Sequence, residues 1–119
     1  MLFLLVTTRA SELSEFTNVL ASSAGEVFSV ESALAALDMA ASLESDFVIV
    51  DETMRGGHPL AFVSELLKVN ARLTTAVISS LSEENFQAQS DGLGVLARIP
   101  FEPTKRDGEK LVETLRRLS

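Results

Sequence analysis

Asp51 has the clearest chemical potential in this sequence, because it directly follows the apolar run Phe47–Val50. A short, continuously apolar run is typical of a strand buried in a parallel sheet. A carboxylate at the carboxyl end of such a strand is a candidate nucleophile. The same side chain could instead only cap the turn that follows, which is a frequent local role of aspartate.

Hydroxyl and cationic side chains follow other apolar runs. The segment Thr7-Thr8-Arg9 follows the run Leu2–Val6, and Ser79-Ser80 follows the run Thr75–Ile78. If these runs are parallel strands, their carboxyl ends meet at one edge of the sheet, which is where such sheets bind ligands. We therefore look for function at this edge.

Four polar residues near these ends have simpler interpretations. Glu52 should point to the other side of the strand from Asp51 and be solvated. His58 should be an exposed loop residue, and Ser79-Ser80 could do no more than hydrogen-bond the adjacent backbone.

The composition excludes several classes of site and partner. The 119 residues contain no Cys, which rules out disulfides, thiolate metal sites and cysteine nucleophiles, and the single histidine rules out a histidine-rich metal site. A formal net charge of −7 lacks the basic footprint of a nucleic-acid-binding protein. No stretch approaches the roughly 20 apolar residues of a membrane span. We expect a cytoplasmic protein that contacts neither nucleic acid nor a membrane.

Apolar runs of strand length alternate with helical periodicities along the chain. The predicted strands are Leu2–Val6, Val27–Val30, Phe47–Val50, Thr75–Ile78 and Val95–Ile99. Apolar residues at spacings of three and four predict helices around Leu13, Phe16 and Leu20, around Leu60, Val63 and Leu67, and around Leu111, Leu115 and Leu118. The Ala-rich stretch Ser32–Ser45 and the weaker candidate Ser82–Asp91 complete five predicted helices.

Several helix ends carry recognisable signals. Ser11, Ser82 and Thr104 are predicted to cap helix starts, the last as a capping box with Asp107. Strands alternating with helices predict an α/β protein, a parallel sheet covered by helices on both faces. We expect one domain over residues 1–119 and no effector domain.

The chain resembles the receiver domains of response regulators in two-component signalling. In that family an acceptor Asp ends the third strand, a Met follows three residues later, a Ser or Thr ends the fourth strand and a Lys-Pro pair ends the fifth. Asp51, Met54, Ser79 and Ile99-Pro100-Phe101 occupy the matching positions. The resemblance implies a flavodoxin-like, doubly wound five-stranded sheet in the order 2-1-3-4-5.

Two departures from the family pattern concern its chemistry. Receivers end the first strand with an acidic pair, where this chain has Thr7 and Thr8. In receivers that pair holds Mg²⁺ with the acceptor Asp and a backbone carbonyl, here that of Thr53, and a hard ion loses affinity with its carboxylates. Ile99 replaces the lysine that pairs with the phosphoryl group. We expect no cofactor, and at most weak Mg²⁺ binding through Asp51 and Thr53.

In receivers an aromatic side chain on the fifth strand changes rotamer in response to phosphorylation, and this chain has no such residue. The chain has no Tyr or Trp, and Leu96 takes the place of the aromatic residue on the fifth strand. Arg9 and Arg55 both lie in loops that could reach Asp51. One guanidinium could pair with the Asp51 carboxylate in place of the metal; otherwise both arginines are exposed loop residues.

Three functional hypotheses follow. The preferred one is a stand-alone, degenerate receiver that is not an enzyme and acts by phosphorylation-independent protein binding, as a homodimer or with another protein. The resemblance implies contact through Ser82–Asp91, Val95–Ile99 and Thr104–Leu118, the last with a basic strip that is either solvated or meets an acidic partner. The alternatives are a phosphoacceptor modified at Asp51 and a flavodoxin-like ligand-binding domain using the loop Thr7–Ser11.

Overall fold

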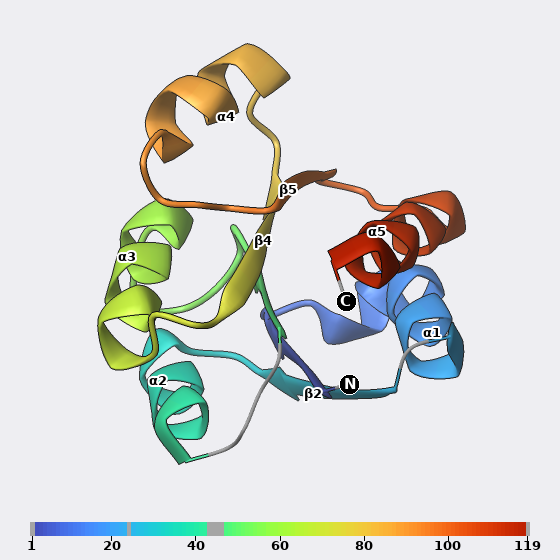
Figure 1. Ribbon diagram of the computed structural model, residues 1–119. Coiled ribbons are helices and arrows are strands. Elements are labelled where there is room, and N and C mark those ends of the chain that lie inside the picture. The colour runs from blue at the N-terminus through green and yellow to red at the C-terminus, as the bar shows by residue number, and fades with distance from the viewer. Residues whose placement is uncertain (1, 24, 43–46, 119) are drawn as a thin grey trace.

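Five parallel strands form one sheet in the order β2-β1-β3-β4-β5 (Figure 1). The computed structural model describes residues 2–23, 25–42 and 47–118. The strands are β1 (Leu2–Val6), β2 (Glu26–Val30), β3 (Phe47–Asp51), β4 (Thr74–Ser79) and β5 (Ala97–Pro100). This arrangement confirms the predicted fold class and strand order.

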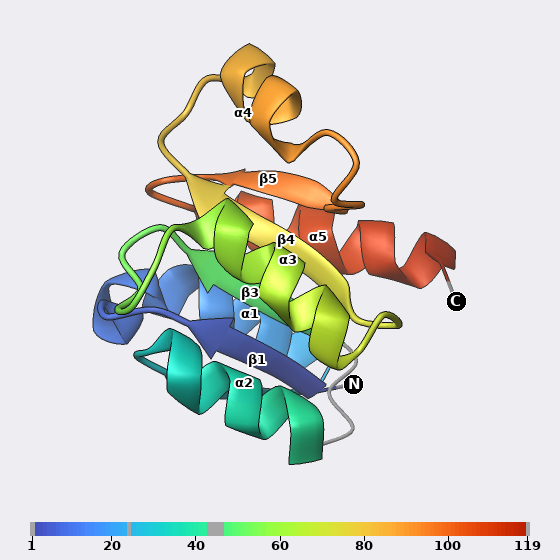
Figure 2. The same cartoon turned by 90° about the vertical axis from the view of Figure 1, so that its left-hand side faces the viewer.

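Helices cover both faces of the sheet. They are α1 (Ser14–Ser23), α2 (Ala33–Ser42), α3 (Pro59–Val69), α4 (Glu83–Ser90) and α5 (Lys105–Leu118), with a 3₁₀ turn, η1 (Ala10–Leu13), ahead of α1. Figures 1 and 2 show α1 and α5 on one face and α2 and α3 on the other, with α4 beyond the sheet near β5. Among the described residues, no helix is both long and apolar enough to cross a bilayer.

The central strand β3 is buried along its whole length, because the sheet is covered on both sides. Its alternate side chains enter two separate cores. Phe47 and Ile49 pack with α1 and α5, whereas Val48 and Val50 pack with α2 and α3. Alternation therefore explains why this strand is uniformly apolar up to Asp51.

Local signals at the element ends are partly confirmed. Ser82 caps α4 by accepting the Asn85 N–H at 3.2 Å. Thr104 and Asp107 form the predicted capping box, in which the Asp107 N–H donates to Thr104 Oγ1 at 3.3 Å and the Thr104 N–H donates to Asp107 Oδ2 at 2.8 Å. The Ser11 cap is wrong, because the helical segment begins earlier, as a 3₁₀ turn after Arg9.

The bounds of the last strand and of the second helix differ from the prediction. β5 begins at Ala97 instead of Val95, although the Leu96 N–H still donates to Thr75 O at 2.8 Å. The second helix runs from Ala33 to Ser42; the end of the predicted range Ser32–Ser45 lies outside the described residues. A short apolar run therefore predicts that a strand exists more accurately than it predicts the residue at which the strand begins.

Gly108 allows α5 to lie close against α1. A Cβ placed on Gly108 would be 3.0 Å from Phe16 O and 3.1 Å from Val19 Cβ. Such distances are shorter than most real Cβ contacts, so with a larger residue here the neighbouring atoms of α1 would have to shift by a few tenths of an ångström.

We predict that Gly108→Ala lowers the free energy of unfolding by about 1–2 kcal/mol, because overpacking outweighs the gain in helix propensity. Urea unfolding followed by circular dichroism measures this. The control is Glu109→Ala on the exposed side of the same helix, which should change stability by less than about 0.5 kcal/mol. Equal or greater stability of Gly108→Ala would contradict the close packing.

Candidate functional site

The pairing of β1 with β3 brings Thr7 beside Asp51. Val6 lies opposite Val50 in the parallel register. The residues that come next, Thr7 and Asp51, therefore lie side by side at the carboxyl edge of the sheet. Asp51 itself has no solvent-exposed surface, and Thr7 is also buried. A buried carboxylate is stable only when charges and hydrogen bonds compensate for its lost hydration.

Four hydrogen bonds supply that compensation. Asp51 Oδ2 accepts from Thr7 Oγ1 at 2.7 Å, from Thr53 Oγ1 at 2.6 Å and from Arg9 Nε at 2.8 Å. Asp51 Oδ1 accepts from an Arg9 terminal nitrogen at 2.9 Å. The guanidinium thus binds both carboxylate oxygens, a charge-assisted geometry that arginine forms particularly well.

Arg9 also reaches the loop that follows β5. The nitrogen that binds Asp51 Oδ1 also donates to Phe101 O at 2.6 Å, and the guanidinium carbon lies 4.0 Å from the centre of the Phe101 ring. The second contact is a cation–π interaction. One side chain therefore joins the loop after β1 to the end of β3 and to the loop after β5.

The Thr8 hydroxyl binds a backbone oxygen close to the ion pair of Arg9 and Asp51. Thr8 Oγ1 donates to Thr53 O at 2.8 Å. Thr7 Oγ1 in turn accepts the Arg9 N–H at 3.0 Å, which holds the first loop in place. Two of the three hydroxyls of the predicted ligand loop Thr7–Ser11 thus donate to Asp51 and to Thr53, at and just after the end of β3.

The environment of Asp51 acts on its pKa in two directions. Burial raises the pKa of Asp51. The hydrogen bonds from Arg9, Thr53 and Thr7 and the positive charge of Arg9 together lower the pKa by more than burial raises it, so it lies below its ordinary value of 3.8. The hydrogen bond with Asp51 raises the pKa of Arg9 against the opposing effect of burial. Both groups are therefore charged at neutral pH.

The two arginines considered from the sequence have different positions. Arg9 pairs with Asp51, whereas the exposed Arg55 lies 3.8 Å from Glu31. Arg55 is held by its backbone, which bonds to Glu31 and Ala33 and links its loop to the start of α2. These backbone bonds place the Arg55 side chain beside Glu31, whereas Arg9 follows β1, which pairs directly with β3.

The residues at the ends of the last two strands take no part in this hydrogen-bond cluster. Ile99 is buried in the core on the α1 and α5 face, and Leu96 packs beside it. Ser79 is buried at the end of β4, and its Oγ accepts the Leu81 N–H at 3.1 Å, a bond to the adjacent backbone. These positions provide no further cation near Asp51.

Two polar residues have more specific roles than the sequence suggested. Glu52 is not merely solvated, because its carboxylate accepts from Ser80 N at 2.9 Å and from Ser80 Oγ at 3.0 Å. It thereby joins the ends of β3 and β4. His58 is exposed as expected, but it is the N-cap position of α3. Strand alternation gave the direction of Glu52 but not the partner from the next strand.

Comparison with known proteins identifies the fold. No family model matches the sequence, and no curated protein matches it significantly. A two-component response regulator from Clostridium difficile aligns over 100% of this chain and 98% of its own, with a TM-score of 0.84 and 11% identity. The chemotaxis response regulator CheY4 of Vibrio cholerae aligns over 99% and 98%, with a TM-score of 0.81 and 17% identity.

A CheY-like response regulator receiver domain protein from Methanospirillum hungatei is similar over 98% of this chain and 97% of its own, with a TM-score of 0.77 and 16% identity. At these identities the likeness concerns the fold. The chain has the receiver-domain fold of response regulators, which confirms the resemblance at that level.

The side chains at this edge do not fit a resident Mg²⁺ ion. Magnesium requires a near-octahedral set of oxygen ligands. Asp51 is the only carboxylate in the cluster, and its oxygens already accept four hydrogen bonds; Thr53 O is taken by Thr8. In the described part of the chain, no group of three or more His, Cys, Asp or Glu could hold a metal ion.

We predict that Arg9→Ala destabilises the protein by about 3 kcal/mol, because it leaves the buried Asp51 charge without its ionic partner. The matched control is Arg55→Ala, whose exposed ion pair should contribute less than about 0.5 kcal/mol. Chemical unfolding measures both. Similar small losses for the two variants would show that the buried pair does not stabilise the fold.

The lowered pKa of Asp51 predicts the sign of an acid effect. Its contribution to stability is complete above the unfolded pKa and is lost as pH falls below 3.8 through the folded value. The difference in unfolding free energy between the wild type and Asp51→Asn should therefore be largest near neutral pH and shrink in acid. A difference that stays constant down to full protonation would refute this linkage.

Proposed function

We propose that this chain is a signalling domain of two-component type that acts by binding another protein, without a phosphoryl group on Asp51. The carrying observation is the pairing of both Asp51 carboxylate oxygens with Arg9. No cofactor and no catalysed reaction belong to this function. Arg9 acts in place of a metal ion and keeps the loops after β1 and β5 in one arrangement with the end of β3.

The chemistry of phosphoryl transfer supports this proposal. Transfer to Asp51 needs a carboxylate oxygen to attack phosphorus while the bond to the donor's leaving group breaks, with cations to stabilise the phosphoryl oxygens. Here the attacking oxygens are engaged by Arg9 and two hydroxyls, and the side chain at the expected lysine position is the buried, apolar Ile99. Attack would first require the Arg9 pair to break.

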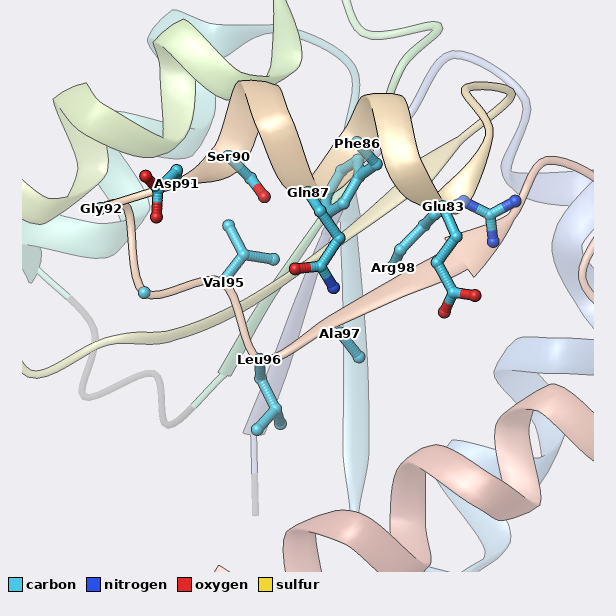
Figure 3. A pocket seen from close by; sticks show the side chains of 11 residues that line it. Glu83, Phe86, Gln87, Ser90, Asp91, Gly92, Val95, Leu96, Ala97 and Arg98 are labelled. Atoms are coloured by element: carbon cyan, nitrogen blue, oxygen red, sulfur yellow. The ribbon is translucent and has the colours of Figure 1, made fainter.

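The proposed binding surface consists of α4, β5 and α5. A groove of about 410 Å³ lies between α4 and β5, with Phe86 between the helix and the sheet (Figure 3). Glu83 and Asp91 line this groove, whereas α5 carries the exposed cations Arg106 and Lys110. The positive charge of α5 favours a partner with an acidic surface. A second copy of the chain has such a surface in the acidic residues of α4.

The decisive test is incubation with acetyl phosphate and MgCl₂, followed by intact-mass measurement and amide NMR spectra. We expect no added phosphoryl mass and no magnesium-dependent shifts at Thr53 or Ser79. A receiver domain that accepts phosphate serves as the positive control. A phosphoryl adduct that is absent from Asp51→Asn would overturn the proposal and favour the phosphoacceptor alternative.

A further inference from the structure

A second cavity, of about 360 Å³, lies on the other side of Phe86 from the groove beside β5. It opens between α4 and the loop that leads from β3 into α3. Leu60, Val77 and Phe86 contribute apolar surface, and all three are buried side chains of the core. Its volume falls in the range of small-molecule sites.

Ser79 gives this cavity a buried hydrogen-bond donor. The residue lines the cavity and is only 4% exposed. Its Oγ accepts the Leu81 N–H at 3.1 Å, but no acceptor for its own O–H is found among the residues that the structure describes. A buried hydroxyl with an unused donor is costly, so an acceptor atom placed here would be stabilised.

Glu52 gives the same cavity a fixed acceptor. Its two carboxylate oxygens accept from Ser80 N and Ser80 Oγ, which orients the group at the ends of β3 and β4. Each carboxylate oxygen has a further lone pair for a ligand donor. The negative charge disfavours an anionic ligand.

We propose that this cavity binds a small neutral molecule that carries an amide on an apolar ring. The amide carbonyl accepts from Ser79 Oγ, its N–H donates to Glu52, and the ring packs against Leu60, Val77 and Phe86. An ammonium group would not serve, because it has no acceptor for Ser79.

This site is separate from the charge pair at the edge of the sheet. Neither Arg9 nor Asp51 lines the cavity. The inference therefore does not rest on the proposed signalling function. Failure of the phosphoryl-transfer test would leave it standing, and its own failure would leave the signalling function standing.

Titration of the folded chain with benzamide, followed by amide NMR spectra, tests the proposal. We expect saturable shifts at Ser79, Leu81 and Gln89, which belong to this cavity or adjoin it. Benzoate should bind much more weakly because of Glu52, and N,N-dimethylbenzamide should bind more weakly because it lacks the N–H donor. Shifts confined to other regions, or equal binding of benzoate, would overturn the proposal.

Variants separate specific binding from adsorption to an apolar surface. Ser79→Ala and Glu52→Gln should each raise the dissociation constant of benzamide, about fivefold for the loss of a neutral hydrogen bond at Ser79. Ser90→Ala, in the groove on the other side of α4, is the matched control and should leave it unchanged. Unchanged affinity in Ser79→Ala, with the fold intact by NMR, would refute the donor role of Ser79.

Discussion

The buried ion pair between Arg9 and Asp51 is the interaction on which the carboxyl edge of this fold depends. Asp51 ends the most deeply buried strand, where an uncompensated charge would cost several kcal/mol. Arg9 and two threonine hydroxyls provide the compensation, and the same guanidinium holds Phe101 O. The electrostatic requirement of one carboxylate therefore also fixes the loops after β1, β3 and β5 relative to one another.

A cation that belongs to the chain differs in kind from a bound metal ion. A guanidinium stays charged throughout the physiological pH range, and its planar donors match both carboxylate oxygens. It does not have to be taken up from solution, and it cannot dissociate from the protein as a bound metal ion can. The family resemblance implies reversible chemistry at this edge in receivers, and here an intramolecular ion pair takes that position. A fixed arrangement of loops is suited to a constant binding surface.

The sequence predicted the parallel sheet well because buried parallel strands impose continuous apolar runs such as Phe47–Val50, and the family resemblance supplied the strand order. It also placed Asp51 at the correct edge, and it reduced the possible cationic partners to two. It could not choose between Arg9 and Arg55, because that choice depends on the loop after β3, where the backbone of Arg55 bonds to Glu31 and Ala33. Glu52 and Ser80 meet across the ends of β3 and β4, and no local pattern reports a contact over 28 residues of sequence separation. The start of β5 was placed too early because Val95 and Leu96 are as apolar as strand residues.

The attachment of α4 has a consequence for how the molecule opens. Phe86 is the one buried residue of this eight-residue helix, and a cavity lies on each side of it. Few buried apolar contacts mean a small free energy for local unfolding. Hydrogen exchange in α4 should thus proceed through detachment of this helix alone, while β1 and β3 exchange only when the whole domain unfolds. On this basis we expect two cooperative units in one small fold: the strands with the charged edge, and α4.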